Sequence, residues 1–231
     1  MTTAAFKHYS FDLWLTLIRS NPSFKQERTR FFHQHFNNSN KTPDEVAFVF
    51  RKVDLMCNAI NEKTGGNIDA EEMYLMVISM INDYDTSFGH VDMAGLMREM
   101  DALIYAYPPQ LYATETLPVL ERLKQQDCTI NILSNTGFIK GGTLRNILAE
   151  LGLAALVDFQ LYSDEEGMSK PNTQFFQRML HTATGHRAAL TAGDVVHIGD
   201  NPNADVAGAA AAGISSLLIN SNNESILSIF N

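Results

Sequence analysis

Residues 6–16 read FKHYSFDLWLT, an aromatic-rich apolar run that leads directly into an acidic residue, Asp12. The first part of this run, Phe6 to Leu13, predicts a β-strand. A lone strand of this length is not stable in water, so it must join a sheet formed by later segments. The rest of the sequence therefore has to supply its neighbours.

The sequence after Pro109 supplies such a sheet, because strand-like and helix-like segments alternate there. The predicted strands are residues 128–133, 159–162, 195–198 and 215–219, and the predicted helices are residues 117–126, 143–151, 173–181 and 204–212. This alternation indicates a parallel sheet covered by helices on both faces. The predicted fold class is therefore α/β, with a Rossmann-like doubly wound parallel sheet as the core.

The stretch between the first strand and Pro109 has the apolar spacing of helices instead. Thr42 can cap one helix, Pro43 suits its first turn and Glu45 completes a capping box. A Gly-Gly pair at 65–66 ends this helix, and about four helices are expected in all. The predicted domains are a core domain of residues 1–19 and 110–231, and an inserted all-helical domain of residues 20–109.

The composition suits a soluble globular protein, since 45% of the 231 residues are hydrophobic and 19% are charged. The 17 basic and 26 acidic residues give a formal net charge of −9, which argues against a nucleic-acid partner. No apolar run reaches the roughly 18 residues of a spanning helix, and the N-terminus does not read as a signal peptide. We expect a cytoplasmic protein with no membrane partner, whose cysteines, Cys57 and Cys128, are buried free thiols. No pattern indicates an oligomeric state.

Polar segments follow the predicted strands, at the edge where an open parallel sheet binds its ligands. They are Asp12–Thr16, Ser134–Gly137, Ser169–Pro171 and Gly199–Asp205. Three of them converge on this edge by topology alone. Lys170 comes several residues after its strand and must be brought in by a loop.

The chemistry of these segments indicates an anion site. Asp12, Asp200 and Asp205 would repel one another and raise one another's pKa values unless a cation intervened. Mg²⁺ suits this role, because it binds a few carboxylates and keeps several waters. Lys170 adds a second positive centre and Ser134 a hydrogen-bond donor, so a tetrahedral anion such as phosphate would fit. An ionised Asp12 could attack it in line and form an acyl phosphate.

In this order, the segments resemble the four motifs of the haloacid dehalogenase (HAD) superfamily. Residues 20–109 resemble the helical cap that this family inserts between its first and second motifs, so the resemblance covers essentially the whole chain. It implies a Mg²⁺-dependent hydrolase with a small anionic metabolite, a phosphoric monoester, as substrate. It makes Asp12 the nucleophile, Thr16 a hydroxyl that supports the first loop, Ser134 and Lys170 phosphate or substrate contacts, and Asp200 a Mg²⁺ ligand.

Other residues of the segments have two interpretations each. Asn135 is either a turn residue or a substrate contact. Asp205 is either a further acidic residue near the metal or an acid that favours the start of the following helix. By the resemblance, the backbone carbonyl of Trp14 completes the metal ligands. The Trp14 ring either packs against the cap or forms a platform for the substrate.

Trp14 also departs from the family pattern. Phosphatases of this family have an Asp at this position, which protonates the leaving oxygen and later activates water. Indole does not titrate, and losing such an acid typically costs ~10²–10⁴-fold in rate. The family's 2-haloacid dehalogenases also lack the acid, but the segment Gly199–Asp205 is the metal-binding, phosphatase-like version. We expect a slow phosphatase; the alternatives are a carbon–halogen hydrolase and a catalytically impaired binding module.

Two residues close to these segments are given ordinary roles. His197 is expected to be a half-buried histidine with its hydrogen bonds satisfied rather than a ligand. Arg19, near the predicted hinge, is expected to be solvated rather than a substrate contact.

Overall fold

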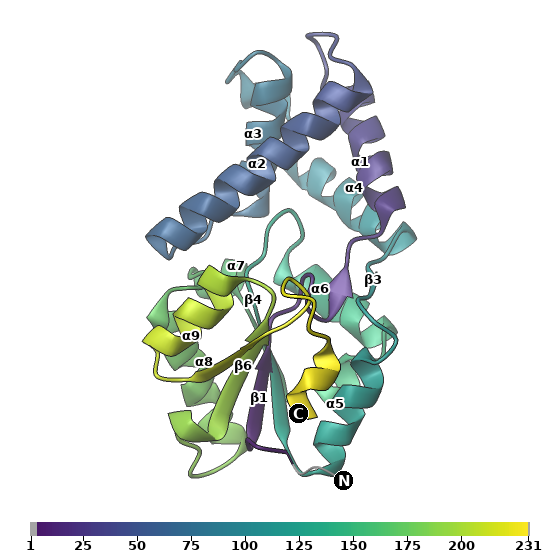
Figure 1. Cartoon of the computed structure of the whole chain (residues 1–231). Helices are drawn as coiled ribbons and strands as arrows, with labels where there is room; N and C mark the ends of the chain where they lie inside the picture. Colours follow the sequence, from purple (N-terminus) through teal and green to yellow (C-terminus); the bar gives the residue numbers. More distant parts are fainter. Residues whose placement is uncertain (1–3, 231) are drawn as a thin grey trace.

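The computed structural model describes residues 4–230, and its centre is a parallel sheet (Figure 1). Within this described part, the sheet has five strands in the order β5-β4-β1-β6-β7. The strands are β1 (His8–Phe11), β4 (Thr129–Ser134), β5 (Phe159–Tyr162), β6 (Val195–Gly199) and β7 (Ser215–Leu218). β1 pairs with β4 on one side and β6 on the other, so the first strand is the central one. The predicted α/β class with a doubly wound parallel sheet is confirmed.

Helices cover both faces of this sheet. α5 (Thr116–Gln125) and α6 (Gly141–Glu150) lie on one side, and α8 (Thr173–His186) and α9 (Gly208–Ala211) lie on the other (Figure 1). A separate cluster of buried apolar side chains fills each side. The shorter pieces are α7 (Ser163–Glu166) and the 3₁₀ turns η2 (Ala154–Leu156), η3 (Ala192–Asp194) and η5 (Ile226–Phe230).

One predicted helix differs from the structure. The Ala-rich residues 204–212 were expected to form a regular α-helix, but the chain forms a π-helical turn, η4 (Pro202–Ala207), followed by the short α9. The turn begins early because the Asn201 side chain accepts hydrogen bonds from the backbone N–H groups of Asn203 and Ala204. Such turns interrupt helices mostly at functional sites.

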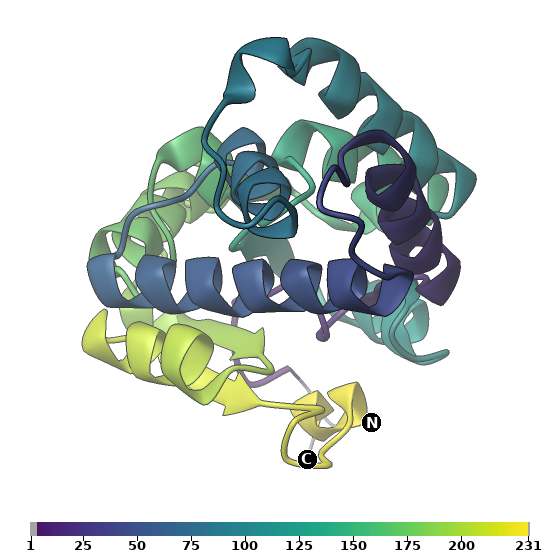
Figure 2. The same cartoon turned by 90° about the horizontal axis from the view of Figure 1, so that it is seen from above.

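Residues 20–109, called the helical region below, contain α1 (Pro22–His35), α2 (Pro43–Thr64), α3 (Ala70–Ile81), η1 (Phe88–His90) and α4 (Met93–Ala106). The capping box between Thr42 and Glu45 is present, and Gly65 ends α2 in the left-handed conformation, at φ 73°. The region has its own cluster of buried apolar side chains. Seen from above, α2 lies across the molecule (Figure 2).

The chain passes between the sheet and the helical region at a short antiparallel pair, β2 (Ile18–Arg19) with β3 (Gln110–Leu111). The sequence did not reveal this pair, because two-residue strands carry no detectable period. It coincides with the predicted domain boundaries, which stay a prediction. Arg19 is exposed on β2.

A loop from the sheet also enters the helical region. After β4 the chain rises toward the helices (Figure 1) and buries Phe138 in their apolar cluster. Its ring centroid lies 5.0 Å from that of Tyr74 and 5.4 Å from that of Phe50, and the Tyr74 hydroxyl donates to the Phe138 carbonyl at 3.1 Å. The two parts therefore share a hydrophobic contact close to the end of β4, besides a second one at which Phe24 and Ile104 pack with Ile147 of α6.

The cysteines and the lengths of the apolar helices can also be compared with the sequence. Cys57 and Cys128 are buried and form no disulfide, as predicted. In the part of the chain that the structure describes, no helix combines the length and the apolar character that crossing a membrane requires.

Candidate active site

Asp12 lies directly after the central strand, at the carboxyl edge of the sheet. Its backbone N–H donates to the Ile198 carbonyl of β6 at 2.8 Å, so strand pairing continues up to this residue. Its side chain is almost completely buried. The Thr16 hydroxyl donates to Asp12 Oδ2 at 3.1 Å, and the Lys170 ammonium donates to Oδ1 at 2.7 Å.

Lys170 is the buried cation of this edge, with its side chain only 1% exposed. Its Nζ contacts Asp205 Oδ1 at 2.7 Å as well as Asp12 Oδ1. The Asn135 side chain fixes the Lys170 backbone from both sides, because its oxygen accepts the Lys170 N–H at 2.7 Å and its amide donates to the Lys170 carbonyl at 2.9 Å. Asn135 therefore positions the loop that carries the ammonium.

Asp205 enters the site from the π-helical turn, and both of its oxygens are already engaged. Oδ1 contacts Lys170 Nζ and lies 3.1 Å from His197 Nε2, and Oδ2 accepts the Asn201 N–H at 2.9 Å. A Cβ on Gly199 would lie 2.1 Å from Asp205 Oδ2. Only glycine leaves room for this carboxylate at the end of β6.

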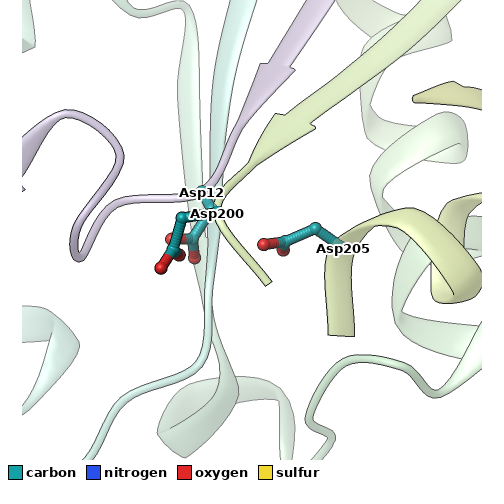
Figure 3. A group of neighbouring side chains, drawn as sticks. All are labelled: Asp12, Asp200 and Asp205. Atoms are coloured by element: carbon teal, nitrogen blue, oxygen red, sulfur yellow. The ribbon is translucent and has the colours of Figure 1, made fainter. Parts of the chain in front are cut away.

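Asp200 completes a group of three carboxylates. Each of Asp12, Asp200 and Asp205 offers an oxygen atom, and these atoms lie within 4.8 Å of one another. Figure 3 shows Asp12 and Asp200 side by side, with Asp205 pointing toward them from the opposite side. An all-oxygen set of this size fits a hard divalent cation such as Mg²⁺.

The pKa values of these carboxyl groups are shifted in different directions. Burial raises the pKa of Asp12 to about 7 although Lys170 opposes it, and burial together with Asp205 raises the pKa of Asp200 to about 6. Burial also raises the pKa of Asp205, but Lys170 and His197 outweigh it and hold this pKa below its ordinary value. Burial lowers the pKa of Lys170, yet Asp12 and Asp205 outweigh it and raise this pKa. Asp205 and Lys170 thus stay charged, whereas Asp12 and Asp200 would gain most from an added cation.

Two candidate residues lie differently from each other. Ser134 ends β4 fully buried, and its hydroxyl donates to the Asn135 carbonyl at 3.1 Å, so it is turned into the chain. Trp14 is half-buried, packs against the apolar cluster on one side of the sheet and lines the cavity above Asp12. Its ring thus lies where the predicted substrate would bind.

This cavity measures about 540 Å³ and lies between the sheet edge and the helical region. Its floor contains Asp12, Trp14, Asn135, Lys170, Asp200 and Asp205, and its roof contains Phe24, Lys25, Arg28, Phe50, Arg51, Asp54 and Glu62. A cavity of this size holds a small metabolite.

His197 has both ring nitrogens hydrogen-bonded, as predicted, since Nδ1 lies 2.9 Å from the Ser10 hydroxyl and Nε2 lies 3.1 Å from Asp205. It is fully buried rather than half-buried, and the sequence did not reveal its contact with Asp205 or two further contributors to the site, Glu62 and Arg28. Its position two residues before Gly199 in a buried strand was the available signal. Glu62 of α2 accepts from Asn201 at 2.8 Å and from Asn203 through another amide, and Arg28 of α1 lines the roof.

Known proteins resemble this chain in sequence and in fold. A ribulose-1,5-bisphosphate 5-phosphatase of Halopiger xanaduensis is 30% identical over 168 residues, which are 72% of this chain and 65% of that relative. YfnB of Bacillus subtilis, described as a HAD-hydrolase and bound to magnesium, matches at a TM-score of 0.70 and 18% identity, over 96% of this chain and 92% of its own. A 2-haloacid dehalogenase of Pseudomonas syringae pv. Tomato DC3000 matches at 0.62 and 20% identity, over 95% and 89%.

The two structural matches show the fold alone at these identities. The family itself is settled by its sequence pattern, since the haloacid dehalogenase-like hydrolase family matches residues 6–213. With this match, the chain belongs to the haloacid dehalogenase-like hydrolases.

Proposed function

We propose that the protein is a phosphoric monoester hydrolase, which acts on a small metabolite through an aspartyl-phosphate on Asp12 with Mg²⁺ as cofactor. The observation that carries the proposal is the contact of Lys170 with both Asp12 and Asp205, at 2.7 Å each, beside a third carboxylate. The partial relative from Halopiger xanaduensis, a phosphatase of a sugar bisphosphate, supports the same substrate class.

The residues present fit Mg²⁺. Asp12, Asp200 and the backbone carbonyl of Trp14 would hold the ion, and Asp205 would lie beside it because its oxygens are taken by Lys170 and Asn201. When bound, the ion supplies the positive charge that offsets repulsion between Asp12 and a phosphate.

The proposed chemistry has two steps on Asp12. An Asp12 carboxylate oxygen forms a bond to phosphorus as the ester P–O bond breaks, and the leaving oxygen takes a proton from the substrate or from water. Water then attacks the acyl phosphate, which releases inorganic phosphate and restores the carboxylate. Thr16 and Lys170 hold the carboxylate in place from its two oxygens.

Trp14 limits the first step. It occupies the position at which the resembling phosphatases have their proton donor, and indole cannot supply a proton. Esters whose leaving group departs without protonation should therefore react best.

The test is hydrolysis of para-nitrophenyl phosphate with Mg²⁺ and with excess chelator. We expect activity only with Mg²⁺, and a loss of at least ~10³-fold in Asp12→Asn. Mass spectrometry of the acid-quenched enzyme should find the phosphoryl group on Asp12. Asp44→Asn, an exposed acid at the far end of α2, is the matched control and should keep wild-type activity. Full activity in Asp12→Asn would exclude the covalent mechanism.

The absent proton donor also favours a second candidate, a carbon–halogen hydrolase, because a halide leaves without a proton. Chloride or fluoride release from 2-haloacids in the presence of chelator would decide for this reaction. Binding of Mg²⁺ and phosphate without turnover of either substrate class would indicate a binding module instead.

A further inference from the structure

Arg28 is a buried cation in the roof of the cavity. It lies on α1, lines the cavity and is only 8% exposed. Its guanidinium carbon lies 4.0 Å from the ring centroid of Phe50, 4.7 Å from that of Phe138 and 5.3 Å from that of Phe24. Side chains of α1, α2 and the loop after β4 thus build one aromatic cage around it.

The cage does not neutralise the charge. Within residues 4–230, no carboxylate lies at ion-pair distance from Arg28. Its hydrogen-bonding neighbour is the neutral Tyr74 hydroxyl, and its Nε has no hydrogen-bond partner. Burial lowers the pKa of Arg28, but a guanidinium starts so far above neutral pH that it stays charged. Buried charges are ordinarily paired, so an unpaired one that lines a cavity lacks its counter-ion.

The charges around Arg28 do not supply that counter-ion. Lys25 and Arg51 line the same part of the cavity and add to its positive charge. Asp54 is the acid near these side chains. It interacts electrostatically with Arg28, Lys25 and Arg51, but it forms no ion pair with Arg28. Glu62 accepts hydrogen bonds from two amide side chains of residues 201–203 instead.

The geometry points to Arg28 as the receptor of a second anionic group on the substrate, which is therefore a small phosphate ester that also carries a carboxylate or a second phosphate. This inference rests on the proposed function, which places the ester phosphate at Asp12 and Lys170. A guanidinium matches both anions with its planar fork of donors, and the cage holds it ready in a poorly hydrated setting. The cavity spans both positions, because the same 540 Å³ is lined by Arg28 and by Asp12.

The test compares matched pairs of esters. 2-Phosphoglycolate is paired with 2-hydroxyethyl phosphate, and 1,3-propanediol bisphosphate with 3-hydroxypropyl phosphate, so each pair differs only in the second anion. In the wild type, kcat/KM should be about 10- to 100-fold higher for the member that carries it. The pair with the larger ratio identifies the anion as carboxylate or phosphate.

The variants locate the effect. Arg28→Gln should reduce this ratio to near one, Arg28→Lys should retain part of it, and Arg30→Gln, an exposed residue of the same helix, should leave it unchanged. Calorimetry with the Asp12→Asn protein gives a readout without turnover: 2-phosphoglycolate or the bisphosphate should bind more tightly than its partner, and Arg28→Gln should abolish the difference.

Each negative outcome has a separate meaning. If no ester, including para-nitrophenyl phosphate, is hydrolysed, the proposed function fails. If esters are hydrolysed but the second anion brings no advantage, or if Arg28→Gln lowers kcat/KM equally for both members of each pair, the assignment of Arg28 is wrong. An unfolded Arg28→Gln protein shifts the decision to Arg28→Lys and to the wild-type ratios.

Discussion

The floor and the roof of the cavity each bury one cation, and they treat it in opposite ways. In the floor, Lys170 is 1% exposed and contacts two carboxylates at 2.7 Å each. In the roof, Arg28 is 8% exposed and has aromatic rings around it but no carboxylate at ion-pair distance among residues 4–230. The chain neutralises the first charge itself and leaves the second to a ligand.

This difference suggests separate roles for the two sides of the cavity: reaction at the floor and substrate selection at the roof. The floor holds Asp12, Lys170 and Asp205 in one hydrogen-bonded network, which is in place without a ligand. The roof offers an unpaired charge whose stabilisation depends on what enters. Removing the two cations should therefore have different consequences for stability and for activity.

The largest effect is expected from Lys170→Met. Without the ammonium, Asp12 and Asp205 lose the cation that they share, which should cost about 3–5 kcal/mol of unfolding free energy and lower kcat/KM by ~10²–10³-fold or more. Chemical denaturation and steady-state hydrolysis measure the two effects. Mg²⁺ should recover part of the stability, because it replaces some of the lost positive charge.

Lys124→Met is the control for Lys170→Met. Lys124 pairs with Asp158 at 2.8 Å but is partly exposed and does not line the cavity. Its loss should cost about 1 kcal/mol or less and leave hydrolysis intact. Equal losses of stability and of activity in the two variants would contradict the role given to Lys170 in the floor.

Trp14→Asp should have an intermediate effect, in the direction of gain. The floor contains the carboxylates and the ammonium, but residue 14 offers no titratable proton donor. A carboxyl group at this position should therefore raise kcat by ~10²-fold for esters with poor leaving groups. The measurement is hydrolysis of an alkyl phosphate beside para-nitrophenyl phosphate. Trp14→Asn loses the same ring without gaining a proton donor, and an equal gain there would refute the interpretation.

The smallest effect is expected from Arg28→Met on the stability of the ligand-free protein. The substitution removes a charge without leaving a carboxylate unpaired, so the unfolding free energy should change by less than about 1 kcal/mol in either direction. Thermal melting without and with 2-phosphoglycolate measures this, and only the wild type should gain stability from the ligand. A loss as large as that of Lys170→Met would show that the aromatic cage needs the cation for folding.

The floor could be predicted from the sequence for a topological reason. The carboxyl ends of parallel strands meet at one edge, so the segments that begin at Asp12, Ser134 and Gly199 had to converge once the strands were identified. Their side-chain directions could not be predicted. Ser134 is turned into the chain, and both oxygens of Asp205 are engaged because Asn201 draws the backbone into a π-helical turn.

The roof could be predicted only as helices. The capping box at Thr42 and the apolar periods indicated where the helices lie, since these signals are local in the sequence. The cage around Arg28 is not local, because Phe50 and Phe138 come from other elements. An arginine at one position of an amphipathic helix has no pattern that distinguishes it from a solvated one.

The loop after β4 has a consequence for how a ligand reaches the cavity. Asn135, which clamps the Lys170 backbone, and Phe138, which is buried among the helices, are only three residues apart. Swinging the helices outward as a rigid body would either pull this short linker along or withdraw the phenyl ring into water, at a cost of about 1.5–3 kcal/mol for a fully exposed ring. Admission of a ligand and alignment of the Lys170 ammonium are thus coupled through three peptide units. An outward movement of the helices that admits a ligand would at the same time displace Lys170 from Asp12.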